Sequence, residues 1–93
     1  MLRIMSLREF LNEDGRKVMC GWDIDRKTFW GAVFANGKYT ELLDTQEQNV
    51  LCNEMRALRL VMPTTLESDL FDDRQHKRTA MYDYKIVKPP EDV

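Results

Sequence analysis

The order of apolar and polar residues predicts a β-meander in the first half of the chain. Apolar residues alternate with others in three consecutive segments, residues 17–24, 27–35 and 38–43, and this period of two is typical of strands. Asn36-Gly37 separates the last two segments and favours a type I′ turn, because both residues accept a positive φ. Asp25-Arg26 is a weaker turn signal between the first two. We therefore predict three antiparallel strands joined by short hairpins.

Turns of even length fix the register of this meander and divide its side chains between two faces. The register pairs Trp22 with Phe29, Val18 with Val33 and Phe34 with Tyr39. One face is apolar and is the predicted core face: Val18, Cys20, Trp22, Ile24, Phe29, Val33 and Leu42. The opposite face is mixed and rich in aromatic residues: Met19, Asp23, Trp30, Ala32, Phe34, Tyr39, Glu41 and Leu43.

Helical spacing predicts two helices in the second half of the chain. Capping boxes begin at Asp44 and Thr45, and a stripe of apolar residues follows, which predicts a helix that ends near Leu60, before Pro63. Thr64 or Thr65 caps the next helix. The two apolar stripes are Leu51, Met55, Leu58 and Met62, and then Leu66, Leu70 and Phe71. Residues 79–87 alternate again and predict a final strand.

Residues 6–12 carry a helical pattern as well. Ser6 and Glu9 fit a capping box, and Leu7, Phe10 and Leu11 fall on one helical stripe. The predicted fold is therefore α+β, with an antiparallel sheet of about four strands, two helices packed on one face and a short N-terminal helix. We expect residues 1–93 to form a single small globular domain with frayed ends at 1–5 and 88–93.

The net charge of -2 hides an uneven distribution along the chain. Residues 1–40 and 74–93 each carry a net charge of +2, whereas residues 41–73 carry -6. The predicted helices therefore present an acidic outer face that includes Glu47, Glu54, Glu67, Asp69, Asp72 and Asp73, beside Glu41 and Asp44. This face either docks a basic partner, mimics a nucleic acid, or is simply a solvated helical surface.

Catalytic chemistry has little support in the sequence, and we expect a protein that is not an enzyme. The one histidine, His76, lies among cations, and no metal-ligand spacing, phosphate loop or nucleophile motif occurs, so no metal or cofactor is expected. Cys20 and Cys52 are predicted to be buried thiols, too few for a disulfide framework, which favours a cytoplasmic location. No apolar run approaches the ~20 residues of a membrane helix.

The aromatic face is the strongest functional signal. Met19, Trp30, Phe34, Tyr39 and Leu43 form more apolar surface than a small monomer normally leaves in water. Either the N-terminal helix covers this face, or the face binds another chain, which is a second copy in a homodimer or a different protein. By analogy with accessory proteins of bacteria and phages, we predict a small protein-interaction module of the inhibitor, adaptor or accessory type.

A nucleic-acid-associated regulator is the alternative prediction. It would use the aromatic sheet together with the basic cluster between Arg74 and Arg78. A sequence pI of about 5.4 makes nucleic acid an unfavoured partner, because nucleic-acid-binding domains usually carry a basic stripe. No small-molecule substrate and no membrane is inferred.

Overall fold

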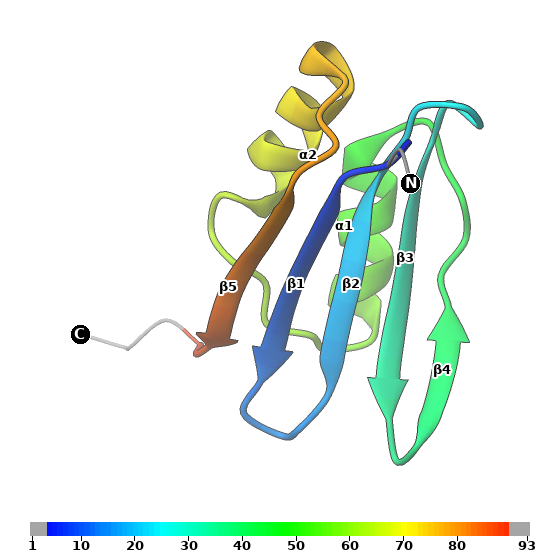
Figure 1. Ribbon diagram of the computed structural model, residues 1–93. Helices are drawn as coiled ribbons and strands as arrows, with labels where there is room; N and C mark the ends of the chain where they lie inside the picture. The colour runs from blue at the N-terminus through cyan, green and yellow to red at the C-terminus, as the bar shows by residue number, and fades with distance from the viewer. Residues whose placement is uncertain (1–3, 90–93) are drawn as a thin grey trace.

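The computed structural model describes residues 4–89, which form a five-stranded sheet with two helices on one face (Figure 1). The elements are β1 (Leu7–Asn12), β2 (Lys17–Asp23), β3 (Thr28–Ala35), β4 (Lys38–Glu41), α1 (Gln48–Ala57), α2 (Leu66–His76) and β5 (Met81–Val87). The strands lie in the order β4-β3-β2-β1-β5. The α+β class is confirmed, but the sheet has five strands and is mixed, because β5 runs parallel to β1.

The prediction of an N-terminal helix is wrong, since residues 7–12 form strand β1 between β2 and β5. The hydroxyl of Ser6 caps no helix. It donates to Asp73 at 2.8 Å and accepts the backbone N–H of Trp22 at 3.0 Å. A helix of two turns is marginal in water, whereas a strand between two neighbours gains hydrogen-bond partners along both edges. Non-local pairing therefore overrides the local helical pattern.

The parallel pairing of β1 and β5 follows from what separates them along the chain. Parallel neighbours require a long crossover connection, and the two helices between β4 and β5 supply one. The pairing of β1 with β5 shifts between Glu9 and Leu11, and Lys85 nearby has a φ of 65°. This irregularity lies in the edge strand β5, where bulges are common.

The predicted register of the meander is confirmed. Trp22 pairs with Phe29, Val18 with Val33, and Phe34 with Tyr39. Asn36 and Gly37 have φ values of 53° and 75°, as a type I′ turn requires. The pattern placed the end of the third meander strand two residues too late: β4 ends at Glu41.

The reason for this early end is a bulge after β4. Leu42 donates its N–H to the carbonyl of Gly31 at 2.8 Å, and Thr45 then pairs with Phe29. Two residues, Leu43 and Asp44, therefore lie opposite the single residue Trp30.

Both helices pack on the predicted core face, and in Figure 1 both lie behind the sheet. α1 begins a turn later than predicted and ends at Ala57 rather than near Leu60, because Arg59 takes a positive φ of 59°. The core consists of Phe10, Val18, Cys20, Trp22, Phe29, Val33, Leu42, Leu51, Cys52, Met55, Leu60, Leu66 and Leu70. Of the ends predicted to fray, residues 1–3 and 90–93 lie outside the described residues, while Met5 forms a bridge with Asp23.

Candidate functional site

The sheet face opposite the helices is uncovered over the part of the chain that the structure describes (Figure 1). We call it the open face. Of the two explanations for the aromatic face, coverage by an N-terminal helix is wrong, because residues 7–12 are part of the sheet itself. β1 and β5 instead widen this face with further apolar residues, namely Leu7, Leu11, Met81 and Ile86.

Pairing across the strands arranges the open face in rows. The aromatic row consists of Tyr39, Phe34, Lys17, Leu11 and Ile86. The acidic row consists of Glu41, Ala32, Met19, Glu9 and Asp83. The tryptophan row contains the pairs Trp30–Gly21 and Leu7–Met81, and the last row contains Thr28, Asp23 and Met5.

Large apolar side chains in these rows are in contact with solvent. Phe34 is 37% exposed and Tyr39 is 61% exposed, and their rings lie 5.0 Å apart at an interplanar angle of 53°. Met81 and Ile86 on the edge strand β5 are also exposed. Exposed large apolar side chains gathered on one face of a small protein typically mark an interaction site.

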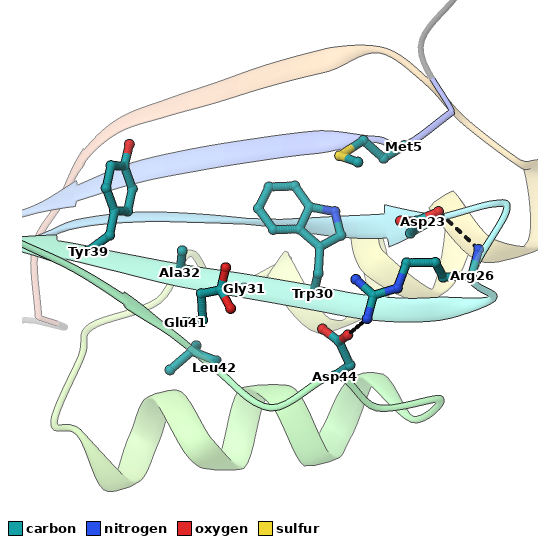
Figure 2. A pocket seen from close by; sticks show the side chains of 10 residues that line it. All are labelled: Met5, Asp23, Arg26, Trp30, Gly31, Ala32, Tyr39, Glu41, Leu42 and Asp44. Carbon is teal, nitrogen blue, oxygen red and sulfur yellow. Dashed lines mark hydrogen bonds and ion pairs between the residues drawn. The ribbon is translucent and has the colours of Figure 1, made fainter.

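A cavity of about 400 Å³ lies on the open face beside Trp30. Figure 2 shows Ala32 as the small residue between Trp30 and Tyr39, so that two large rings stand on either side of a shallow position. An ion pair between Arg26 and Asp44 closes one end of the cavity. The cavity is therefore a hollow with an aromatic wall and a charged rim.

Two polar groups of this hollow are incompletely paired among the described residues. The indole Nε1–H of Trp30 is buried and has no hydrogen-bond partner. The carboxylate of Asp23 is buried and accepts one hydrogen bond at 3.1 Å, from the backbone N–H of Arg26. The residues that line the hollow include neither a thiol nor an imidazole, so what it offers is recognition by hydrogen bonds, charge and apolar contact.

The structure brings together four of the five residues predicted for the aromatic face: Met19, Trp30, Phe34 and Tyr39. Leu43, the fifth, lies beyond the end of β4 and is highly exposed. Its backbone N–H donates to the carboxylate of Glu54 at 3.1 Å, which holds the bulge against α1. Leu7 and Leu11 were not predicted on this face, although they alternate with Arg8 and Phe10 at the period of two that is typical of a strand.

The six acidic residues predicted for the helical face do not form one solvated surface. Asp73 is fully buried, so its placement on the outer face is wrong. Asp69 accepts hydrogen bonds from Tyr84 at 2.6 Å and Thr65 at 2.8 Å, and Glu54 holds Leu43. Glu47 and Asp72 are exposed, and Glu67 is half-buried.

Asp73 belongs to a buried ion pair that links β1 to α2. Arg8 donates from Nε and Nη2 to the two carboxylate oxygens of Asp73, each at 2.7 Å. Arg8 also donates to the hydroxyl of Tyr84 at 2.8 Å and lies over the ring of Tyr82. These contacts make the cluster a structural tie between strands and helix. No local sequence signal joins residues 65 positions apart.

The basic cluster of the alternative prediction is partly engaged in the fold. Arg74 donates to the carbonyl of Gln46 at 2.8 Å and lies over the rings of Phe71, Phe29 and Trp22. Arg78 lies 3.9 Å from the carboxylate of Asp73. His76 is the last residue of α2 and is exposed. Within the cluster, Arg74 is half-buried, while Lys77 and Arg78 are exposed.

The two cysteines are buried free thiols, as predicted. Burial raises the pKa of Cys52 to about 11 and raises the pKa of Cys20 further, so both stay protonated at neutral pH. No group of three His, Cys, Asp or Glu side chains within residues 4–89 is placed to hold a metal ion. Neither helix in that range has the length and apolar composition needed to cross a membrane.

Comparisons with known proteins yield no relative. No protein-family model matches the chain, and neither the curated proteins nor the solved structures contain a match. The open face and its hollow are therefore the features of this chain that point to a function.

Proposed function

We propose that this protein is a non-enzymatic protein-interaction module whose binding surface is the open face. The observation that carries the proposal is the contrast between the two faces of one sheet. The helices bury one face, and the other leaves Phe34, Tyr39, Met81 and Ile86 in contact with solvent. Covering such apolar area is favourable by about 25 cal/mol per Å², which drives association.

The open face supports this function better than the acidic helical surface does. Half of the predicted acidic residues, Glu54, Asp69 and Asp73, are held by contacts inside the molecule. The open face instead combines aromatic anchors with charged residues such as Glu41 and Arg26 at the rim of its hollow. Buried aromatic anchors within a polar rim are the usual anatomy of a protein interface.

Site-specific photo-crosslinking in the cells that make the protein tests the proposal. Benzoylphenylalanine replaces Tyr39 on the open face or, as a control, Phe71 on α2, and both substitutions exchange one aromatic residue for another. We expect a protein adduct from position 39 that position 71 does not give. Equal adducts from both positions, or none from either, would contradict the proposal.

A matched pair of substitutions then ties the adduct to the aromatic row. Phe34 and Phe71 are each 37% exposed, but they lie in the sheet and in the helical layer respectively. Phe34→Ser should abolish the adduct from position 39, whereas Phe71→Ser should leave it. Urea denaturation of both variants checks that each remains folded, because only the loss of association in a folded Phe34→Ser variant supports a binding role.

A further inference from the structure

We propose that the occupant of the open face is a second copy of this chain, which packs face to face in an antiparallel, two-fold symmetric dimer. The inference rests on the proposed function and names its partner. It comes from the shape and the charge of the rows, because an isologous interface must be complementary to itself.

The area of the open face suits such a dimer. Five strands spaced by about 4.8 Å, each about six residues long at about 3.3 Å per residue, span roughly 500 Å² per copy in projection. Side chains stand up from that plane, so the accessible surface buried by two copies exceeds the roughly 1,000 Å² that a specific interface needs. Two sheets packed face to face in this way form a sandwich about 10 Å thick.

Large and small residues alternate diagonally at the centre of the open face. On the central strand β2, Met19 precedes Gly21 on this face, and on β3 the order is reversed, with Trp30 paired to Gly21 and Ala32 paired to Met19. Consider a two-fold axis that lies parallel to the plane of the sheet, crosses the strands at right angles and runs between the acidic and the tryptophan rows. It places the acidic row of one copy over the tryptophan row of the other. Met19 of one copy then lies over Gly21 of the other, where the carbonyl of Ser6 takes the place of a side chain, and Trp30 enters the hollow over Ala32.

The same axis also pairs unlike charges. It lays the aromatic row over the row of Asp23, so that Lys17 lies opposite the incompletely paired carboxylate of Asp23. It brings Glu41 opposite the bulge at Leu43 and Asp44, where Arg26 pairs with Asp44. Within one copy Lys17 already lies 3.5 Å from Glu9, so its ammonium bridges carboxylates of both copies.

Two other two-fold arrangements are electrostatically unfavourable. An axis along β2 places Lys17 over Lys17 and Asp23 over Asp23. An axis perpendicular to the strands but on the acidic row places Glu41, Glu9 and Asp83 each over its own copy. Like charges opposite each other in an interface cost several kcal/mol, which disfavours both relative to the antiparallel arrangement between the two rows.

Analytical ultracentrifugation of the purified full chain over a wide concentration range tests the inference. We expect a species of twice the 11.0 kDa chain mass that dissociates on dilution. Phe34→Ser should raise the dimer dissociation constant by roughly a hundredfold, because each dimer loses two buried rings, while Phe71→Ser should leave it unchanged. A folded wild-type protein that stays monomeric at every concentration overturns the inference.

Lys17→Gln tests the orientation of the two copies. In the antiparallel dimer this substitution removes two attractions to Asp23 and weakens association roughly threefold or more. In a dimer with its axis along β2 it would instead relieve the repulsion between the two Lys17 side chains and strengthen association, which would overturn the proposed geometry.

The outcomes for the dimer and for the proposed function are separable. A monomer in ultracentrifugation whose Tyr39 position still captures a different protein in cells overturns the second copy as occupant, and the interaction module stands. A monomer that gives no adduct from position 39 overturns both.

Discussion

At the scale of single residues, the buried pair of Arg8 and Asp73 ties the sheet to α2. Sequence patterns assigned Arg8 to a helix and Asp73 to an acidic surface, and both assignments were wrong. The reason is physical: a charged residue on a core-facing position is tolerated only when a partner reaches it. The partner comes from a different element, 65 residues away, and a local pattern of residues does not indicate it.

Breaking this pair should be costly. We expect Asp73→Ala to lower the free energy of unfolding by about 3–5 kcal/mol, because Arg8 would remain buried without its counter-charge. Asp72→Ala, which alters an exposed neighbour, should change it by no more than about 0.5 kcal/mol. Urea denaturation measures both values.

A double variant separates the charge from the packing in this prediction. Arg8→Met with Asp73→Leu removes both charges and keeps apolar volume, so it should be more stable than Asp73→Ala alone. If the double variant is instead the less stable of the two, the hydrogen bonds of the pair outweigh the burial of its charge.

At the scale of elements, turn chemistry predicts the meander well because each hairpin is a local structure. The Asn36-Gly37 turn and the alternation of β2 and β3 fix the register without help from the rest of the chain. β1 is the contrasting case. Its residues fit both a helical stripe and a strand, and pairing with β2 and β5 decides between them.

Two glycines in these strands should respond very differently to the same substitution. A Cβ at Gly21 would lie 1.9 Å from the carbonyl oxygen of Ser6, a backbone atom that has no freedom to move away. We expect Gly21→Ala to cost about 3 kcal/mol or more, since the overlap must separate β2 from the segment before β1.

Gly37→Ala is the matched comparison. A Cβ at Gly37 meets no atom within 4 Å, so the only penalty is the positive φ of 75°, which costs about 1 kcal/mol. Thermal and urea denaturation rank the two variants. Equal losses would mean that the close approach of Ser6 to β2 relaxes easily.

At the scale of the whole molecule, one layer of helices on a five-stranded sheet leaves the protein with an apolar surface on each side of the same sheet. The helices bury one side when the chain folds. The other side is left uncovered by residues 4–89, and this is the physical basis for the proposed binding role. The pattern predicted four of the residues concerned, and the widening of the face by β1 and β5 required the sheet order.

Stability of the whole molecule should fall as the pH rises above about 8.5. Burial raises the pKa values of Cys20, Cys52 and Tyr84, so the folded state keeps protons that the unfolded state loses. Each such group lowers the free energy of unfolding by up to about 1.4 kcal/mol per pH unit, from its unfolded pKa, about 8.5 for a thiol and 10 for tyrosine, upward to its folded pKa. Below the unfolded values the full contribution is present.

Urea denaturation at a series of pH values from 7 to 10 measures this slope. Cys52→Ala should roughly halve it, since one of the two thiols that ionise in this window is then absent. A free energy of unfolding that stays constant across the window would contradict the burial of both thiols.

The sequence by itself determined the meander, its register, the core face and the two helices, because turn residues and side-chain periodicity act over a few neighbouring positions. Only the tertiary structure decided that residues 7–12 form a strand, that β5 joins it in parallel, and that Asp73 is buried beside Arg8. It also decided that the open face is uncovered by residues 4–89. These features depend on contacts between segments that are far apart in the sequence. Packing and charge pairing between those segments set the free energy of the contacts, and a short stretch of sequence does not determine either.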